Sequence, residues 1–518
     1  MFLLESMSAA IIISVPLLTG SGSPSRRLCE SAKIAMDSRP CRLSLDNISK
    51  LFYDAFRIHC LYQDCINNSS VRVNRLPSII ALILCTTFVL FMLRLERNQS
   101  PEMTRTLWIP TIWMLYIASK PLGTWFQSGG DTEAGSPIDR AISLALICIS
   151  LWILARRKYD WHAAMKENAW LVVLIILMLA SILWSDIPYI SFKRWTREFL
   201  AVLMAFVVHS EPSPRQAMES ILRRTIYILI PFSLLLIRYF PVYGRIYGRW
   251  SGGEQWVGVA LQKNGLCRLC LIATFFLIWS LIRRRQSHNP PVWKYQTQAE
   301  IFVLVLTLYL MGGPEGSLSY SATANTALCV GFLVYIGFHL LKKFGINLGA
   351  GMLMTIVAII IISGIVTLFS GGSNLKFFVS SVKRDPTLTD RTQLWASLLP
   401  VAMERPILGR GVGGFWTSRT KTEFMVSEGH SGYLDVLLNL GFVGIFLVSG
   451  FLLSSCLKGY KELSNDFDWA TLWICFLIMA LVHNITETSI DTLTSQLTAI
   501  VLFLTVSSAA VRSPTERV

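Results

Sequence analysis

Thirteen uncharged apolar stretches spaced along the chain constrain its fold more than any other feature of the sequence. They lie at 78–93, 106–119, 141–155, 168–184, 199–209, 225–237, 269–282, 301–314, 324–338, 344–370, 436–457, 469–482 and 492–511. A segment inside the hydrocarbon of a bilayer must pair its backbone N–H and C=O groups internally, which an α-helix does. The sequence therefore predicts an all-α, polytopic integral membrane protein.

Several of these stretches are shorter than the roughly 20 residues that a membrane helix needs, so their ends must extend into flanking polar residues. We therefore expect about twelve to fourteen transmembrane helices. The composition agrees, because 53% of the 518 residues are hydrophobic and 15% are charged, which is too apolar for a soluble surface. No stretch carries Asp, Glu, Lys or Arg near its middle, whereas ion-coupled transporters bury such groups at membrane depth.

Lysine and arginine in the short loops predict which side of the membrane each loop faces. Positive residues are retained in the cytoplasm, and they occur at 156–158, 215–224, 283–285, 342–343 and 458–461. The alternating loops at 123–137, 312–323 and 487–491 have acids and no Lys or Arg. We expect this second set, together with 371–432, on the outer side. The net charge of +15 partly reflects the retention signal and requires no nucleic-acid partner.

These expectations divide the chain into four parts. Residues 1–77 form an N-terminal appendage, whose apolar run 9–18 has the length of a signal sequence but follows Glu5 instead of basic residues. Residues 78–370 form a helix bundle with short loops, 371–432 form a long outer segment, and 433–518 form the C-terminal helices. The long outer segment thus precedes the last three helices.

Cations on the outer side are exceptions to the retention of positive residues in the cytoplasm, so their presence there requires a physical explanation. They cluster at 238–264, as Arg238, Arg245, Arg249 and Lys263, among Tyr243, Tyr247, Trp250 and Trp256. The aromatic residues alone suit anchoring at the bilayer edge. Four cations in one outer loop favour an anionic ligand, and guanidinium groups bind diphosphate oxygens through paired hydrogen bonds. Lys193, Arg194 and Arg197 form a second group at the outer edge.

The long outer segment holds a second cluster of polar residues. Residues 390–416 predict a short amphipathic helix that begins near Arg391, followed by a turn rich in glycine that contains Arg410. His430 stands just before a predicted membrane helix, with Tyr433 about one turn further on. A lone histidine at a helix start is usually structural. Its position at the membrane surface, beside a loop rich in arginine and glycine, favours catalysis instead.

Three spaced motifs in this region resemble the signature of the O-antigen ligase and polymerase superfamily. They are D-R-x-x-L-W at 390–395, E-R-P-x-x-G-x-G-x-x-x-F-W at 404–416 and H-x-G-Y-L-D-x-x-L-x-x-G at 430–441. RWSGG and QKNGLCRL within 249–269, S-x-S-x-T-A at 319–324 and HNITET at 483–488 agree with it. The resemblance covers about residues 76–511 and is nearest to the exopolysaccharide polymerase branch. The chain departs from the pattern at Ser431, where asparagine is usual, and at Cys267, where glycine is usual.

The resemblance implies a metal-independent glycosyltransferase in the bacterial inner membrane whose active site faces the periplasm. Such an enzyme moves a glycan from undecaprenyl diphosphate to a hydroxyl of an acceptor sugar and needs no cofactor. Its partners are the lipid-linked oligosaccharide, the acceptor glycan, membrane lipid and other components of polysaccharide export. The polymerase branch joins repeat units, whereas a ligase of the same superfamily attaches the glycan to the lipid A core. The residues do not separate these two acceptors.

The chemistry of this transfer agrees with the two outer clusters. Charge develops on the departing lipid diphosphate, so we expect Arg249 and Arg391 to stabilise it. Neutral His430 can remove the proton of the acceptor hydroxyl as a general base near neutral pH. Direct attack with a single base inverts the anomeric centre. The substrate-binding residues are expected to be Arg245, Lys263, Arg410 and Tyr433, and no metal ligand is expected.

Two other classes of protein fit the sequence less well than this enzyme does. A transporter or flippase of lipid-linked glycans predicts repeated halves and a polar central cavity, whereas the charges here gather at one membrane face. Asp466 and Asp468 match the D-x-D motif of nucleotide-sugar glycosyltransferases, but acids at a helix N-terminus are the ordinary interpretation. Cys267 and Cys270 form a C-x-x-C without a second pair, which favours packing over metal binding.

Overall fold

Each of the thirteen apolar stretches lies on a helix in the computed structural model. The structure describes residues 77–99, 103–126, 136–157, 160–247, 252–286, 293–314, 318–372 and 391–507, which belong to one compact unit within 72–518. The predicted appendage, except for residue 77, lies outside the described residues. The all-α prediction is confirmed, because helices account for nearly all the regular structure among the described residues.

The helices on the apolar stretches are α4 Ser78–Gln99, α5 Trp108–Ala118, α7 Pro137–Arg156, α9 Ala169–Ala180, α10 Pro188–His209, α11 Pro214–Tyr239, α13 Lys263–Gln286, α14 Trp293–Gly312, α15 Ala322–Lys343, α16 Ala350–Phe369, α20 Gly432–Glu462, α21 Phe467–Thr486 and α22 Gln496–Ser507. Shorter helices are α6 Leu122–Trp125, α8 Trp161–Glu167, α12 Pro241–Gly244, α18 Arg391–Met403 and α19 Ser418–Glu423. Strands β1 Arg245–Tyr247 and β2 Glu254–Trp256 form one antiparallel hairpin, with Arg245 opposite Trp256.

Eight of the described helices are long and apolar enough to cross a membrane, namely α4, α7, α11, α13, α15, α16, α20 and α21. The chain is therefore a multi-pass membrane protein. Helices α8 and α9 are joined at a bend of 89° and together meet the same requirement. Helix α22 is apolar but shorter than a full span. The figure of about twelve to fourteen spans stays a prediction.

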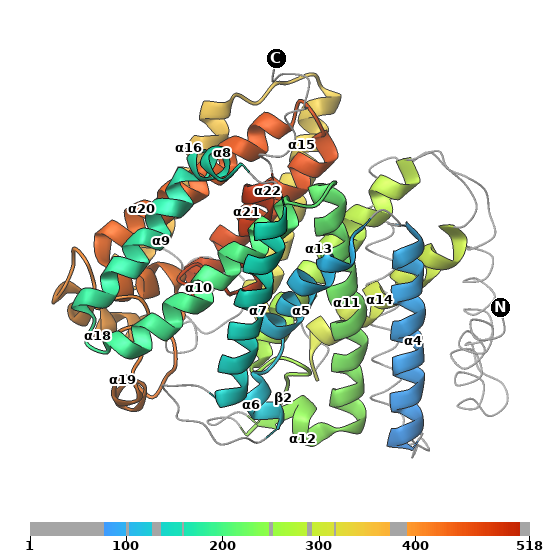
Figure 1. Cartoon of the computed structure of the whole chain (residues 1–518), viewed down its shortest axis with the longest axis horizontal. Helices are drawn as coiled ribbons and strands as arrows, with labels where there is room; N and C mark the ends of the chain where they lie inside the picture. Colours follow the sequence, from blue (N-terminus) through green and yellow to red (C-terminus); the bar gives the residue numbers. More distant parts are fainter. Residues whose placement is uncertain are drawn as a thin grey trace. The chain divides into compact units, whose positions relative to one another are not determined.

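The central helices differ from the peripheral ones in how much of their surface is apolar and buried. Helix α21 is buried on almost every side, with Trp473, Phe476 and Met479 fully enclosed, as expected of a helix that is apolar all round. Helix α4 instead packs against α11 at the edge of the bundle and leaves residues such as Ile79 and Leu90 exposed (Figure 1). Such side chains would face lipid in a membrane.

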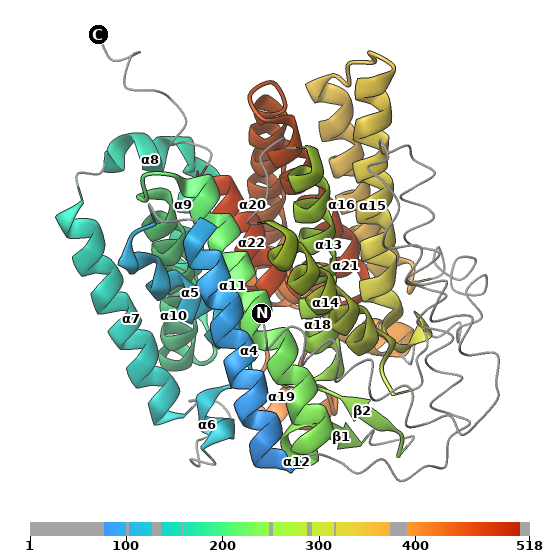
Figure 2. The same ribbon diagram turned by 90° about the vertical axis from the view of Figure 1, so that its right-hand side faces the viewer.

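The two ends of the bundle carry different kinds of loop. The last turns of α15 and α20, which carry basic residues, and helix α8 lie at one end, whereas α6, α12, α19 and the hairpin lie at the other (Figure 2). The alternation of basic and acidic loops predicted from the sequence thus corresponds to two opposite ends. We call the end with the hairpin the outer end.

Several ion pairs lie at the end of the bundle opposite the outer end, which we call the basic end. They account for the contacts of Asp466. Arg215 pairs with Glu462 and lies 3.5 Å from Asp466, while Arg283 lies 2.8 Å from Glu219 and 3.3 Å from Asp466. Asp466 is the N-cap of α21 and accepts the backbone N–H of Trp469 at 3.0 Å. Its contacts are therefore those of a helix cap and an ion-pair partner.

A break in α20 fixes the long outer segment to the bundle. Gly441 has a φ of +65° inside this helix, and a Cβ atom there would lie 2.3 Å from the carbonyl oxygen of Ile407. The freed N–H groups of Phe442 and Val443 donate to Pro406 and Ile407 at 2.8 and 3.2 Å. Only glycine tolerates both this φ and this contact. The segment 404–416 is thereby held against the first turns of α20, which follow His430 directly.

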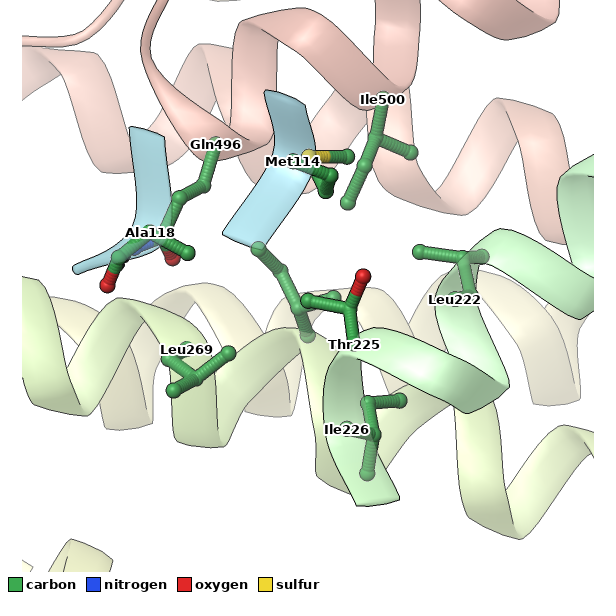
Figure 3. Close-up of a pocket in the computed structure, with 9 residues that line it drawn as sticks. Met114, Ala118, Leu222, Thr225, Ile226, Leu269, Gln496 and Ile500 are labelled. Carbon is green, nitrogen blue, oxygen red and sulfur yellow. Dashed lines mark hydrogen bonds between the residues drawn. The ribbon is translucent and has the colours of Figure 1, made fainter. Parts of the chain in front are cut away.

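A small cavity in the core lies among α5, α11, α13 and α22 (Figure 3). Its volume is about 10 Å³, and its lining is mostly apolar, with the side chains of Met114, Leu222 and Ile500 shown around it (Figure 3). A space of this size holds about one water molecule. It is too small for a substrate, so the chemistry must take place elsewhere.

Candidate active site

His430 is held in a left-handed backbone conformation immediately before α20. Its φ is +49°, which is strained for any residue other than glycine. Asp435, one turn into the helix, accepts the N–H of Gly429 with both oxygens at 3.1 Å. The same carboxylate accepts from Trp416 Nε1 at 2.7 Å and from Thr488 Oγ1 at 2.6 Å. Asp435 is fully buried, so these bonds fix the loop that presents His430.

The His430 ring faces two carboxylates. Its Nδ1 atom lies 3.6 Å from Oε1 of Glu428 and 3.9 Å from Oε2 of Glu487. These separations are too long for hydrogen bonds but short enough for a strong charge interaction. The side chain is 24% exposed, so the ring can still meet a ligand.

Glu487 joins the histidine to Arg391. Arg391, the first residue of α18, donates to the carbonyl of Thr486, and its Nη2 lies 2.5 Å from Oε1 of Glu487. Asn264 on α13 donates to the same oxygen at 2.8 Å, and Gly432 N donates to the Glu487 carbonyl at 3.1 Å. Through its carboxylate and its backbone carbonyl, Glu487 therefore links α13, α18 and the start of α20.

The loop 487–495 between α21 and α22 forms one wall of the site. Arg268 on α13 donates to the carbonyl of Thr488 at 3.2 Å and to Ser495 Oγ at 3.1 Å. The hydroxyls of Thr323 and Thr486 lie 2.9 Å apart, which attaches α15 to the end of α21, where the loop begins. These contacts join the loop and the end of α21 to α13 and α15, which are far from them in the sequence, and give the site a rigid frame.

The acids of the site have different proton affinities. Burial alone would raise the pKa of Glu487, but the neighbouring His430 ring and the Arg391 guanidinium hold it well below its ordinary value. Burial raises the pKa of Glu428, although its side chain is 27% exposed and solvent limits the effect. Burial, followed by the charges of Asp435 and Glu198, raises the pKa of Asp491. Glu487 is therefore ionised throughout the neutral range.

A divalent metal is the other ligand that this cluster could attract. Glu428, His430 and Glu487 each offer one ligand atom, and these atoms lie within 4.8 Å of one another. A histidine with two carboxylates is a chemically suitable donor set. However, Arg391 and Asn264 already contact the Glu487 carboxylate, and a guanidinium beside a ligand oxygen repels a dication. We therefore interpret the cluster as an acid–base site, and metal independence stays a prediction.

The remaining predicted site residues have partners within the protein or lie outside the described residues. Arg249 falls in the latter class. Arg245 on β1 lies 3.0 Å from Glu254 on β2 and donates to the carbonyl of Ile237 at 2.7 Å. Lys263, at the start of α13, places its Nζ 5.4 Å from the ring centroid of Tyr320. The first cluster thus stabilises the outer hairpin and its attachment.

Arg410 and Tyr433 make internal contacts as well. Arg410 pairs with Glu404 and lies 3.2 Å from Asp186, so it braces the glycine-rich turn. Tyr433 is buried in α20, and its hydroxyl donates to the carbonyl of Leu481 at 3.3 Å. The hydrogen bonds and ion pairs of these two side chains do not involve His430 or Arg391, so the site proposed below does not include them.

Sequence reasoning brought His430 and Arg391 to one site but missed the acids that join them. Glu487 belongs to the HNITET element, and Glu428 precedes the histidine by two positions. Both elements were noted for their pattern, but spacing could not place a carboxylate from one loop beside a histidine from another.

Comparison with known proteins adds independent evidence at this point. Residues 317–449, which include Arg391, His430 and Asp435, match the family described as O-Antigen ligase. The exopolysaccharide production protein ExoQ of Rhizobium meliloti (strain 1021) is 21% identical over 346 residues, which are 63% of this chain and 73% of that protein. These two findings support an assignment of the chain to the O-antigen ligase and polymerase superfamily. The family points to a glycosyl-transfer enzyme of polysaccharide synthesis.

Proposed function

We propose that the chain polymerises undecaprenyl-diphosphate-linked oligosaccharide repeat units at the periplasmic face of the inner membrane, in the synthesis of an exopolysaccharide. The observation that carries the proposal is the arrangement of His430, Glu487 and Arg391 at the outer end of the bundle. A partly exposed base there has a buried anion on one side, and a cation contacts that anion.

The proposed reaction is a single displacement at the anomeric carbon. The Nδ1 atom of His430 faces the two carboxylates, which leaves Nε2 for the acceptor hydroxyl. Nε2 takes the hydroxyl proton as the oxygen bonds to the anomeric carbon, and the bond from that carbon to the diphosphate oxygen breaks. The diphosphate leaves with the electron pair, and the product is inverted. The anionic Glu487 stabilises the imidazolium that forms, as a buried carboxylate does for a catalytic histidine elsewhere.

Arg391 supports the departure of the diphosphate. Its guanidinium has five N–H donors. Its hydrogen bonds to Thr486 and Glu487 leave other N–H groups for phosphate oxygens. A preorganised cation beside a leaving group costs no reorganisation during the reaction. Arg249 keeps the same proposed role on the sequence argument alone.

The polymerase assignment rests on the similarity to the exopolysaccharide production protein ExoQ, because ligase and polymerase share this chemistry. The alternative is an O-antigen ligase that transfers the glycan to the lipid A core. Deletion of the gene separates them when secreted polysaccharide and lipopolysaccharide are both analysed. A polymerase mutant loses high-molecular-weight polymer and retains single repeat units. Lipid A core without O-chain, with long glycan still on the lipid carrier, would establish the ligase instead.

A flippase of lipid-linked glycans is the second alternative. Purified protein in detergent solution, where no compartments exist, distinguishes it from an enzyme. We expect such protein to extend lipid-linked repeat units, with undecaprenyl diphosphate released in step. Absence of any extension by a preparation that still binds the lipid-linked substrate would support transport.

A further inference from the structure

The three cations of the second outer group on α10 have different surroundings. Arg194 donates to the carbonyl of Gly413 and, at 3.1 Å, to that of Trp416, so it holds the glycine-rich turn. Lys193 lies with its Nζ 3.9 Å from the ring centroid of Tyr189. Arg197, one turn deeper, forms no hydrogen bond or ion pair with any residue that the structure describes. It is exposed, and it lines a cavity.

The lining of this cavity combines polar and apolar groups. Its volume is about 170 Å³, and it lies among α5, α7, α10 and the loop before α22. The lining residues are Trp113, Tyr116, Ile117, Ser119, Pro121, Ser143, Arg197, Leu200 and Thr494. They comprise one cation, four hydroxyl groups and an apolar remainder, with no carboxylate. This combination suits an anionic head attached to an apolar chain.

The cavity is adjacent to the active site through the loop 487–495. Thr494 lines the cavity, while Glu487 at the other end of the loop contacts Arg391. Leu493 N donates to Oε2 of Glu198, which follows Arg197 on α10, at 2.5 Å. The charges of Glu198 and Glu428 both act on Asp491, which belongs to this loop. The loop 487–495 therefore lies between the cavity and the active site.

The depth of Arg197 indicates what kind of anion it meets. It stands nine residues after Pro188, which is about 13 Å along the helix axis from the outer end. Helix α7 beside it exposes apolar side chains such as Leu144 and Leu151, as a helix facing lipid does. A cation at such a place is costly unless it meets an anion or reaches the membrane surface. The phosphate group of a lipid supplies such an anion at this depth.

We propose that this cavity is a second lipid site, which holds the diphosphate head of the acceptor's lipid carrier while the donor's diphosphate occupies the site of Arg391. The inference rests on the proposed polymerase function, because a polymerase joins two lipid-linked glycans. Arg197 binds the diphosphate, and the hydroxyl of Thr494 donates to it. The prenyl chain extends between α7 and α10 into the membrane. The acceptor sugar then passes over the loop 487–495 to His430.

Native mass spectrometry of the full-length protein in detergent tests the proposal, with undecaprenyl diphosphate as the probe. We expect wild type to bind two molecules and Arg197→Gln to lose the second, with its dissociation constant raised at least about tenfold, since a charge-assisted contact is removed. Arg140→Gln is the matched control, because Arg140 is an exposed arginine at the outer end of α7 and does not line the cavity. It should keep both molecules.

Several outcomes would overturn the inference. Retention of two bound lipids by Arg197→Gln would do so, and so would equal loss of the second lipid in the Arg140 control. A second site that phosphatidylglycerol fills as readily as undecaprenyl diphosphate would make the cavity a general phospholipid site. The proposed function fails separately, if His430 variants still make polymer while lipid binding is as expected.

Discussion

Arg391 pairs with the buried Glu487 at the outer end of the bundle, with 2.5 Å between Nη2 and Oε1. The other oxygen of that carboxylate lies 3.9 Å from Nδ1 of His430. The proposed base and the proposed leaving-group cation are therefore connected through one anion. A diphosphate that approaches Arg391 competes with Glu487 for the guanidinium, which leaves more of the carboxylate's charge for the histidine. In the proposed mechanism, binding of the donor would therefore strengthen the base at the step in which it takes the hydroxyl proton.

His430→Gln should abolish polymer formation while the protein inserts and accumulates normally. Loss of a general base costs a factor of about 10² to 10⁴ in rate, and the exposed side of the ring takes no part in helix packing. The measurement is the rate of polymer formation at matched protein level. His162→Gln is the control, because His162 is exposed on α8 at the basic end. Near-normal polymer from His430→Gln would make this histidine a structural residue.

Arg391→Lys should be severely impaired although the charge is kept. The guanidinium reaches the Thr486 carbonyl and Glu487 from two nitrogens, and an ammonium cannot reproduce that planar geometry while also meeting a phosphate. Arg405→Lys is the control, because Arg405 is an arginine of the same outer segment with a side chain 46% exposed. The same loss is expected for Arg249→Lys. If both lysine variants polymerise well, a general positive potential suffices and specific phosphate contacts are not required.

The topology predicts opposite labelling of two exposed positions. Thr422 lies on α19 at the outer end, and Lys343 ends α15 at the basic end. In a cysteine-free background, Thr422→Cys should react with an impermeant maleimide in intact cells. Lys343→Cys should react only after lysis, because basic ends are retained in the cytoplasm. The reverse pattern would place His430 in the cytoplasm, where the proposed donor is not expected.

The helices could be located from the sequence because the bilayer imposes a simple rule on the backbone. Every apolar stretch must form a helix to satisfy its N–H and C=O groups, and each one does. The number of spans did not follow, because α5 and α22 have 11 and 12 residues. Whether such short helices cross the membrane depends on their neighbours and not on their own composition.

The site was predictable only in part, for a physical reason. Arg391 stands out because a cation on the outer side conflicts with the retention of positive residues in the cytoplasm. His430 stands out because it lies at the membrane surface beside a loop rich in arginine and glycine. Glu487 lies 96 positions from Arg391, and only the packing of α18 against α20 and of α20 against α21 brings them together. For the same reason Arg245 and Arg410 were expected to be available to a ligand, whereas Glu254 and Asp186 reach them in the folded chain.

Gly441→Ala should destabilise the outer segment and reduce activity. The added Cβ would meet the Ile407 carbonyl oxygen at 2.3 Å, and the φ of +65° disfavours any side chain. A strained left-handed position costs about 1–3 kcal/mol, and relief requires the turn 404–416 to move away from α20. Gly337→Ala on α15 is the control, since a Cβ there meets nothing within 4 Å. The measurements are the thermal unfolding midpoint in detergent and the polymerisation rate, and equal midpoints for the two variants would contradict the expectation.

Glu487→Gln should lower both stability and activity, with a pH dependence that identifies the charge as the cause. The neighbouring His430 and Arg391 hold the pKa of Glu487 below its usual value of 4.5. A carboxyl group whose pKa is lower in the folded state stabilises the fold above its unfolded pKa, and this contribution is lost as the pH falls through the folded pKa. The gap in thermal midpoint between wild type and Glu487→Gln should therefore be full at pH 7 and begin to narrow below about pH 4.5. Glu423→Gln, at an exposed position on α19, should show no such gap. A gap between wild type and Glu487→Gln that stays constant from pH 7 to the lowest accessible pH would mean that the shape of the residue matters and its charge does not.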